Sequence, residues 1–445
     1  MNADASLSAA ASPSPIRESI RVALLGLGTV GRGVFRMLEE NSASIRAKAG
    51  LPVELVRIGV RDLGRVRGIE FPHLTDDARS IVQDPDIDVV IELIGGIDPA
   101  LDLVERALEA GKSVVTANKE LIAKHGGRLL RMAFERGIDL HFEAAVGGGI
   151  PLVQPLKHQL AGNDVVRLMG ILNGTTNYIL TQIAERGVSF EEALSHAQAF
   201  GFAEADPTND VEAYDAAYKI AILGSIAFGG PIPVEQVYRE GIQGVQPDDV
   251  HFADVLGYAI KLVAICEPGA GGRSVSARVH PLLVPKEHPL AGVRNEYNAL
   301  WFQGDFVGDV MFSGRGAGAE ATASAVVGDL IDVARNLKIK GPGSVIPWGD
   351  PIEVEPIGLA RSSYYLRLLV DDRPKVLGEI ALALGEHGVS LSAMAMRVFD
   401  SANHVGEIVF LTHEVEERLF QRALADLEQL MVVKKVCNWL RVVEK

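Results

Sequence analysis

Two lysines and several carboxylates are the residues of this 445-residue chain whose types and spacing suggest chemistry. Asp215 and Lys219 stand four residues apart, so a helix places both on one face. The residues around them, from Ala216 to Leu223, are mostly apolar, and a charged pair in a core is costly unless it serves a purpose. The alternative is an exposed ion pair with a structural role alone. We favour a catalytic pair in which Asp215 keeps Lys219 protonated and oriented.

Three more charged residues extend this candidate site. Glu204 and Asp210 precede the pair, and a carboxylate cluster suits the binding of a cationic amino group. We expect Asp210 to be the N-cap of the helix that carries Lys219. Lys119 follows the strand predicted at residues 113–116, at the edge where open α/β sheets bind ligands; a surface lysine is the alternative. An ammonium group there could contact a bound ligand.

A glycine-rich turn points to a bound dinucleotide. The apolar strand that starts at Ile20 leads into Gly26-Leu27-Gly28-Thr29-Val30-Gly31, and a helical pattern follows. In this context the glycines permit a tight turn, a close approach of the backbone to a pyrophosphate, and close packing of helix on strand. The next strand ends near Arg61, where a cation suits the 2′-phosphate of NADP better than the 2′-hydroxyl of NAD. A solvated loop arginine is the alternative.

The composition excludes several classes of partner. The net charge of −15 argues against a nucleic acid or an anionic membrane, since both require a basic surface. No apolar run reaches the ~18 residues that a membrane span needs. The two cysteines, Cys266 and Cys437, are far apart, which fits a reducing cytoplasm. Residues 1–19 lack the apolar core of a secretory signal, and we expect a disordered tail there.

The chain is long enough for two or three domains. Alternating strand and helix patterns over residues 20–150 predict a Rossmann-type, doubly wound parallel sheet of the α/β class that binds a dinucleotide. Residues 151–340 predict an α+β domain, with a helix at 256–264 and a last helix able to pack back on the first domain; the resemblance described below implies that this is the catalytic and dimerisation domain. Residues 341–360, rich in proline and glycine, predict a linker. The βαββαβ pattern of residues 361–445 predicts a ferredoxin-like regulatory domain, which we expect to be removable near Pro356.

Six motifs in a fixed order give the chain a resemblance to a known family. On these motifs it resembles homoserine dehydrogenases with a C-terminal ACT domain, in the monofunctional form without a kinase segment. The likeness covers essentially all of the chain after the tail. The motifs are the glycine fingerprint at 26–31, TANK at 116–119, EAAVGGGIP at 143–151, NGTTNYIL at 173–180, GFAEADPTNDVEAYDAAYKIAIL at 201–223 and GAGAEATASAVVGDL at 316–330.

The resemblance implies an activity, cofactors and regulation. The family reduces L-aspartate 4-semialdehyde to L-homoserine with a nicotinamide cofactor, on the route to threonine, methionine and isoleucine. We expect NADP, with NAD as the alternative, together with a monovalent cation, sodium. The ACT domain implies control by an amino acid, here threonine, although Ser390 stands where many ACT domains carry asparagine. A cytoplasmic homodimer or homotetramer is expected.

The resemblance also implies roles for individual residues. Lys219 resembles the proton donor, and Lys119 resembles a lysine that reaches both substrate and nicotinamide. The residues that resemble substrate-binding acids are Glu204, Asp210 and Asp215.

The cofactor and the cation have their own implied contacts. Gly318 and the fingerprint glycines resemble contacts of the nicotinamide cofactor. Glu143, with the backbone carbonyls of Val146, Gly148 and Ile150, resembles the sodium-type cation site.

Three other functions stay open at this point. An acylating semialdehyde dehydrogenase would need a cysteine nucleophile, and neither Cys266 nor Cys437 lies in a polar, glycine-rich context. A regulator that binds a nucleotide and an amino acid without turnover is disfavoured by the crowding of lysines and carboxylates. A related reductase of another amino-acid aldehyde is the third alternative.

Overall fold

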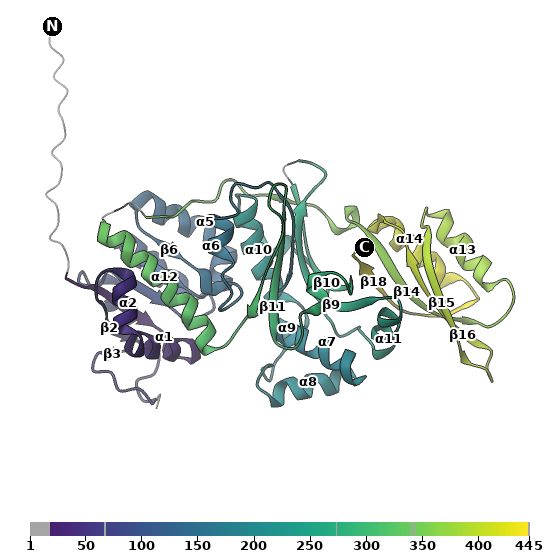
Figure 1. Ribbon diagram of the computed structural model, residues 1–445, viewed down its shortest axis with the longest axis horizontal. Helices are drawn as coiled ribbons and strands as arrows, with labels where there is room; N and C mark the ends of the chain where they lie inside the picture. Colours follow the sequence, from purple (N-terminus) through teal and green to yellow (C-terminus); the bar gives the residue numbers. More distant parts are fainter. Residues whose placement is uncertain (1–17, 66–67, 273, 340, 342, 444–445) are drawn as a thin grey trace, which may run out of the picture.

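The structure is a computed structural model that describes residues 18–65, 68–272, 274–339, 341 and 343–443. Most of the tail expected at residues 1–19 lies outside these residues. The molecule is elongated, with the N-terminal unit at one end and the C-terminal unit at the other (Figure 1). The middle unit, which carries α7, α10 and a mixed sheet, lies between them.

The first unit is built on a parallel sheet of six strands in the order β3-β2-β1-β4-β5-β6. Alternate residues of its buried strands face two different cores. Ala23 and Leu25 face the core that contains α4 and α5, whereas Val22 and Leu24 face the core that contains α1 and α12. The predicted doubly wound sheet is therefore confirmed, because helices cover both faces. The elements are β1 (Ile20–Leu25), α1 (Thr29–Glu40), α2 (Ser42–Ala49), β2 (Val53–Gly59), β3 (Leu74–Thr75), α3 (Ala78–Gln83), β4 (Val89–Glu92), α4 (Ala100–Glu109), β5 (Ser113–Thr116), α5 (Lys119–Arg136) and β6 (Leu140–His141).

A helix from much later in the chain completes this first unit. Helix α12 (Ala319–Ile339) packs along α1, and both supply side chains to the same core. A side chain on Gly33 of α1 would collide with the backbone carbonyl of Ala319, so the glycine allows the two helices to approach closely. This return places the loop before α12 beside the carboxyl edge of the parallel sheet.

The middle unit carries strands in the order β12-β11-β7-β9-β10, with helices packed on one face. The helix expected at 256–264 is wrong, because most of this segment belongs to strand β9. Its side chains alternate between two cores, with Leu262 in one and Val263 in the other, so both faces are apolar and no two-residue period is visible. The elements are η1 (Glu143–Ala145), α6 (Val153–Lys157), β7 (Val165–Ile171), α7 (Gly174–Arg186), α8 (Phe190–Ala199), α9 (Thr208–Val211), α10 (Tyr214–Ala227), η2 (Val234–Gln236), β8 (Tyr238–Arg239), α11 (Pro247–Val255), β9 (Tyr258–Pro268), β10 (Ser274–Pro285), η3 (Pro289–Gly292), β11 (Tyr297–Gly304) and β12 (Gly308–Arg315).

The start of α10 also differs from expectation. Asp210 is not its N-cap, because Asp210 lies in the short preceding helix α9. The N-cap of α10 is Ala213, whose φ of 65° is left-handed. This conformation is strained for alanine, and it separates the two helices. The break frees the Asp210 carboxylate for a contact elsewhere.

The last unit has the predicted βαββαβ order. One extra short strand, β17, pairs with β14. Helices α13 and α14 supply side chains to its core, together with the strands. The elements are β14 (Arg361–Asp371), α13 (Val376–Glu386), β15 (Leu391–Asp400), β16 (Val405–Thr412), β17 (Val415–Glu416), α14 (Glu417–Gln429) and β18 (Val433–Val442).

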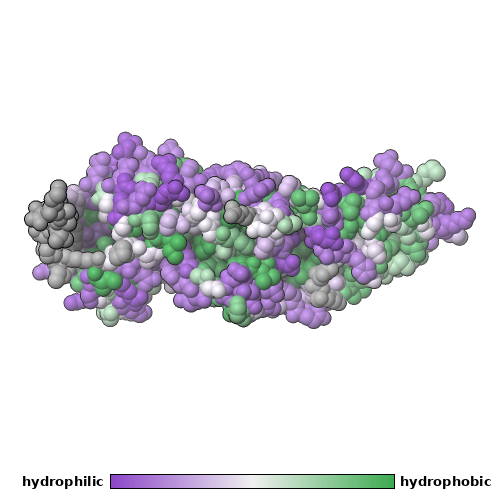
Figure 2. All heavy atoms as spheres, turned by 90° about the horizontal axis from the view of Figure 1, so that it is seen from above, coloured by the Kyte–Doolittle hydropathy of each residue, from purple (hydrophilic) through white to green (hydrophobic). Residues whose placement is uncertain are grey.

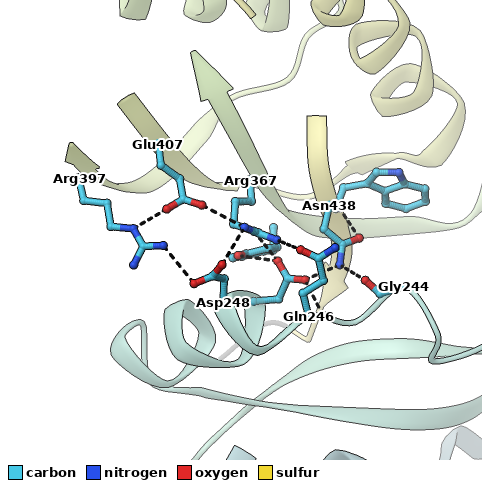
Figure 3. A network of polar contacts seen from close by, with 10 residues as sticks. Gly244, Gln246, Asp248, Arg367, Arg397, Glu407 and Asn438 are labelled. Atoms are coloured by element: carbon cyan, nitrogen blue, oxygen red, sulfur yellow. Dashed lines mark hydrogen bonds and ion pairs between the residues drawn. The ribbon is translucent and has the colours of Figure 1, made fainter. Parts of the chain in front are cut away.

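The last unit is joined to the middle unit by sheet pairing and by charge. Strand β18 pairs with β10, with Leu282 opposite Arg441, so one sheet runs through both units. A polar network spans the same junction (Figure 3), where Arg367 Nε donates to Asp249 Oδ1 at 2.6 Å and Arg367 Nη1 donates to Glu407 Oε1 at 3.0 Å. Arg367, Asp249 and Glu407 are all buried.

The segment before the last unit is packed rather than free. Val345 and Trp348 are buried, and the Trp348 ring lies edge-on to Phe142. Strand β13 (Glu353–Val354) pairs with β10, and η4 (Ile357–Leu359) follows it. Hydrophilic side chains cover much of the face seen in Figure 2, with apolar patches between them. Within the described residues, no helix is long and apolar enough to cross a membrane.

Candidate active site

The carboxylate of Asp215 lies at the centre of the site. Lys219 Nζ, one turn along α10, donates to Asp215 Oδ2 at 2.7 Å. Lys119 Nζ, from the first turn of α5, donates to Asp215 Oδ1. Asn173 Nδ2, from the turn between β7 and α7, donates to Asp215 Oδ2 at 2.9 Å. The structure thus brings together the two lysines that the sequence singled out, on one buried carboxylate.

The charges of this cluster shift one another's pKa values. Burial raises the pKa of Asp215, but the Lys219 and Lys119 ammonium groups outweigh it and hold that pKa well below its usual range. Burial lowers the pKa of Lys119, yet the attraction of Asp215 raises it overall. Burial lowers the pKa of Lys219, and the Lys119 charge adds to this effect. Of the two lysines, Lys219 therefore holds its proton less firmly.

Lys219 is held in place by a second acceptor. Its Nζ also donates to the backbone carbonyl of Leu172 at 2.7 Å. An ammonium group has three hydrogens, so two are engaged and the third can serve a ligand. The side chain of Lys219 is 11% exposed, against 42% for Lys119. Lys219 is thus fixed and mostly enclosed, whereas Lys119 reaches into the open cleft.

Asn173 is a site residue that sequence reasoning did not assign. Its amide bridges two carboxylates, because Nδ2 donates to Asp210 Oδ1 at 2.7 Å as well as to Asp215. Its Oδ1 accepts from the Thr176 amide at 2.8 Å and so caps α7. The sequence showed Asn173 in a turn-prone motif, but the contact of Asn173 with Asp210 depends on the break between α9 and α10.

A cleft of about 720 Å³ opens in front of these groups. Glu204 lies exposed at its edge, and Asp210 is half-buried within it. Burial raises the pKa of Asp210, and the negative charge of Asp215 raises it further. Lys219 and Asp215 are thus buried at the inner end of the cleft, Lys119 and Asp210 are half-buried, and Glu204 is exposed. Its lining residues include Lys119, Asn173, Glu204, Asp210, Asp215, Lys219, Asn298, Gly316 and Gly318.

Asn298 is a second residue that the sequence did not flag. It lines the cleft and is 1% exposed, yet neither polar atom of its amide has a partner among the described residues. A side chain on Gly316 would collide with this amide, so the glycine leaves room for it. Because an unpartnered buried amide is costly, a ligand in the cleft is the natural source of its hydrogen bonds.

The glycine turn has the geometry that a pyrophosphate requires. Gly26 has a φ of 101°, and a side chain there would collide with the carbonyl of Leu93. A side chain on Gly31 would collide with the carbonyl of Gly26, whereas the space beside Gly28 is open. Gly28 caps α1 without a side-chain hydrogen bond. The first amides of α1 are therefore available to a phosphate, and the residues fit a dinucleotide.

Arg61 lies beside this turn. The Gly26 amide donates to the carbonyl of Gly59, at the end of β2, at 2.9 Å. Arg61 follows two residues later and is exposed. A guanidinium at this point can reach the ribose end of a dinucleotide bound at the glycine turn.

The loop before α12, residues 316–318, lies between the catalytic cleft and the glycine turn at 147–149, where a cation site is expected. Gly318, with a φ of 114°, lines the cleft. A side chain on Gly148 would collide with the carbonyl of Gly316, so the 147–149 turn packs directly against the 316–318 loop. Any ion held by the first loop would therefore brace the wall of the cleft.

The donors predicted for a cation fit only in part. The Glu143 carboxylate accepts from the amides of Leu152, Val153 and Gln154 at 2.6, 2.9 and 2.7 Å, so this side chain caps α6 and is not free for an ion. The carbonyls of Val146, Gly148 and Ile150 accept no hydrogen bond from the part of the chain that the structure describes. Unpaired carbonyl oxygens suit a hard cation, and the backbone rather than the Glu143 side chain would hold it.

The arrangement can deliver a proton to an oxygen that gains negative charge. It also places Glu204 at the exposed edge and Lys219 in the buried interior, which orients a ligand that carries both an amino group and a carbonyl. Cys266 cannot act as a nucleophile here, because it is fully buried and burial raises the pKa of its thiol. The site is therefore suited to acid–base chemistry on a ligand that lies next to a bound dinucleotide.

Comparisons with known proteins agree over nearly the whole chain. Residues 26–143 match the family model "Homoserine dehydrogenase, NAD binding domain", residues 151–331 match "Homoserine dehydrogenase", and residues 364–430 match "ACT domain". A homoserine dehydrogenase of Synechocystis is 42% identical, over 95% of this chain and 99% of its own length. The crystal structure of a homoserine dehydrogenase from Thiobacillus denitrificans superposes with a TM-score of 0.90 at 40% identity, over 96% of this chain and 98% of that one. That from Staphylococcus aureus at pH 6.0 gives 0.76 at 36% identity, over 96% and 100%.

Proposed function

The chain belongs to the homoserine dehydrogenase family, and from this premise we propose that it reduces L-aspartate 4-semialdehyde to L-homoserine with Lys219 as the proton donor. The observation that carries the proposal is the pair of lysines on one buried carboxylate, inside a cleft that reaches the loop before α12. A bound nicotinamide supplies the hydride. The chain itself must orient the aldehyde and protonate its oxygen.

The proton transfer follows from the hydrogen bonds of Lys219. As the aldehyde carbon gains the hydride, its oxygen becomes an alkoxide, and the free third hydrogen of the Lys219 ammonium moves to it. Leu172 and Asp215 hold the nitrogen in position throughout. The lowered pKa of Lys219 makes this donation easier. Lys119 stays charged, because its pKa is raised, and its ammonium stabilises the developing negative charge.

Substrate binding uses the acidic opening of the cleft. The α-ammonium of the substrate suits Glu204 and Asp210, since both carboxylates lie nearer the solvent than Asp215. With the ammonium held there, the aldehyde at the other end of the substrate points toward the lysines. Asp215 acts mainly by fixing Lys119, Lys219 and Asn173.

The preferred cofactor in this proposal is NADP. Its support is the position of Arg61 beside the glycine turn, where a guanidinium can pair with a 2′-phosphate. NAD is the alternative. A sodium ion on the carbonyls of Val146, Gly148 and Ile150 is part of the proposal as a structural brace of the 316–318 loop.

Control by threonine through the C-terminal unit is the regulatory part of the proposal, in a route to threonine, methionine and isoleucine. The matched ACT domain supports an amino-acid effector. We also propose a cytoplasmic homodimer or homotetramer; two unpaired cysteines are compatible with a reducing compartment.

The direct test measures turnover of L-aspartate 4-semialdehyde with NADPH and with NADH, each with and without L-threonine. The proposal expects oxidation of NADPH that depends on the semialdehyde. Faster turnover of another amino-acid aldehyde would instead support the related-reductase alternative. Tight binding of NADPH without any turnover would support a non-catalytic regulator and contradict the proposal.

A further inference from the structure

A buried glutamate lies at the carboxyl end of β4, on the cofactor side of the first unit. Glu92 is the last residue of this strand and is fully buried. Among the residues that the structure describes, no lysine, arginine or histidine forms an ion pair with it. A buried carboxylate without a cation is costly unless hydrogen bonds compensate for the lost water.

The hydrogen bonds of Glu92 come from the loop after β4 and from the end of β5. The amides of Ile94 and Gly95 donate to Glu92 Oε1 at 2.7 and 3.2 Å. The Thr116 hydroxyl donates to Glu92 Oε2 at 2.6 Å. That hydroxyl also accepts from the Asn118 amide at 3.0 Å, so its own hydrogen is directed to Glu92. Three donors thus hold a carboxylate directly behind the loop.

The same contacts tie the 94–96 loop to the helix that carries Lys119. Asn118 Nδ2 donates to the carbonyl of Gly96 at 2.6 Å. Asn118 Oδ1 accepts from the Leu121 amide and caps α5, of which Lys119 is the first residue. The loop and the lysine are therefore held in a fixed relation by one hydrogen-bonded unit at the carboxyl edge of the sheet.

The 94–96 loop lies on the nicotinamide side of the dinucleotide site. From β1 the sheet continues to β2 and β3 on one side and to β4, β5 and β6 on the other, and such sheets bind a dinucleotide across this point. With Arg61 beside the adenosine end, the nicotinamide end belongs to β4 and β5. Gly95 and Gly96 are exposed, with φ of 80° and 69° and open space beside each, so the loop allows a ligand to approach closely.

The other carboxylates at the ends of β4 and β5 do not place an unbalanced negative charge behind this loop. Asp98 follows the loop but is exposed, so water and salt screen its charge. Glu120 pairs with Lys124 at 2.7 Å. Asp215 carries two lysines, which outnumber it. Glu92 differs from these groups because it is buried and its partners are neutral.

We propose that Glu92 is a positioning residue that holds the 94–96 loop and whose negative charge stabilises the oxidised, cationic form of the nicotinamide ring. In the proposed reaction the ring gives a hydride, with its two electrons, to the aldehyde carbon and changes from neutral to positively charged. The aldehyde oxygen gains negative charge, which the lysines on Asp215 stabilise. An anion on the ring side and cations on the oxygen side favour both changes. The inference rests on the proposed function for the identity of the cofactor.

The test compares the affinities of full-length variants for NADP⁺ and for NADPH, titrated without substrate in a calorimeter. Glu92→Gln keeps the shape of the side chain and an acceptor for the loop amides while removing the charge. We expect the dissociation constant of NADP⁺ to rise at least about fivefold more than that of NADPH, which corresponds to about 20 mV in the potential of the bound couple. Thr116→Val is the matched control, because it removes a neutral member of the same hydrogen-bonded unit. It should change both constants by the same factor.

Several results would overturn the inference. Equal changes of the two constants in Glu92→Gln would leave Glu92 with a structural role alone, and a larger loss for NADPH would have the wrong sign for a nearby anion. A wild type that binds neither nucleotide would also refute it. If Glu92→Gln does not fold, Glu92→Gln with Thr116→Val, which removes the hydroxyl that faces the new amide, is compared with Thr116→Val instead.

Turnover is assayed separately from these titrations. A wild type that binds both nucleotides but does not reduce the semialdehyde would contradict the proposed function. In that case the ratio of the two dissociation constants would still decide whether Glu92 acts on the nicotinamide ring.

Discussion

At the scale of single residues, Lys219 is the proposed proton donor, and Lys119 is proposed to stabilise the developing negative charge. Replacing Lys219 with Met keeps its length and helix propensity while removing the proton and the charge. We expect kcat to fall by roughly 10²–10⁴-fold, with little change in the dissociation constant of NADPH, because the glycine turn lies elsewhere. Steady-state kinetics and a binding titration measure the two quantities. Lys124→Met is a matched control, since Lys124 also pairs with a carboxylate four residues away, Glu120.

A misfolded Lys219→Met protein would have a physical cause, the loss of one of the two cations on buried Asp215. The double variant Asp215→Asn with Lys219→Met removes both charges and guards against that outcome. If the folded double variant turned over nearly as fast as the wild type, Lys219 would not be the donor. Lys119, which touches the same carboxylate, would be the next lysine to replace.

The cofactor prediction concerns Arg61. Arg61→Ala should weaken NADPH binding by about 1.5–3 kcal/mol, the size of a hydrogen bond to a charged group, and should leave NADH binding nearly unchanged. Dissociation constants from fluorescence titration of both cofactors test this. Arg57→Ala, on strand β2 just before Arg61 and paired with Asp84 at 3.7 Å, controls for loss of positive charge. Equal losses for NADPH and NADH would refute a contact with the 2′-phosphate.

Of the residues around the Asp215 carboxylate, Lys219 was predictable from the sequence and Asn173 was not. The pairing of Asp215 with Lys219 follows from helical spacing alone, and the structure contains it. The role of Asn173 could not be predicted, since it depends on the left-handed residue Ala213, which directs Asp210 toward the turn before α7. Glu143 shows what the resemblance alone leaves open. The resemblance implied a cation site that includes Glu143, and the Glu143 carboxylate accepts from three backbone amides at the start of α6.

At the scale of elements, a buried histidine links α12 to β6. His141 lies between Asp139 and Asp329, with ring nitrogens 3.5 Å from each carboxylate. Burial alone would lower the pKa of His141, but hydrogen bonds to the two carboxylates outweigh it and raise the pKa to about 9. The folded pKa is thus above the unfolded value of about 6.5. The stabilisation is complete below pH 6.5 and is lost as pH rises through about 9.

We therefore expect wild-type protein to lose stability between pH 6.5 and 9 more steeply than His141→Gln, by on the order of 2–3 kcal/mol. Lys157 acts in a different window, since burial lowers its pKa to about 8, and that contribution to stability grows with pH up to about 10.5. Because the wild type and His141→Gln both keep Lys157, the contribution of Lys157 to the pH dependence of stability cancels when the two are compared. Urea unfolding across this pH range is the measurement, with exposed His158→Gln as the control. Parallel curves for His141→Gln and wild type would mean that His141 is neutral.

The order of strands and helices predicted for the last unit is confirmed, although β14 and β16 are buried along most of their length. Strand β9 was predicted as a helix because both its faces are buried, one against the helices and one against the 289–293 segment. Periodicity carries no information when every position is apolar.

At the scale of the whole molecule, sequence reasoning treated the last unit as separable, and the junction makes that expectation doubtful on physical grounds. Ending the chain near Pro356 would remove β18 from the edge of β10 and uncover apolar side chains that now pack against Tyr365, Leu440 and Val442. We expect the truncated protein to unfold at a lower temperature and to associate, since unpaired edges and apolar patches promote aggregation. Calorimetry and light scattering would detect this, and a truncated chain with the melting temperature and oligomeric state of the full-length protein would show that the units are independent.

The charge at the same junction allows a test in the full-length chain. Arg367 is 3% exposed and serves two fully buried carboxylates, Asp249 and Glu407. Arg367→Met removes the cation and should destabilise the fold by about 3–5 kcal/mol, the cost of leaving a buried charge without its partner. Glu407 keeps Arg397, so most of that cost falls on Asp249.

The double variant Arg367→Met with Asp249→Asn should therefore recover most of the stability, measured by urea unfolding. Recovery would show that the junction needs balanced charge rather than this particular pair. If the double variant stayed as unstable as Arg367→Met, the loss would come from the packing of the guanidinium and its bond to Gln246 Oε1 at 2.8 Å. In that case the two units would be held together by the shape and hydrogen bonds of the Arg367 side chain rather than by its charge.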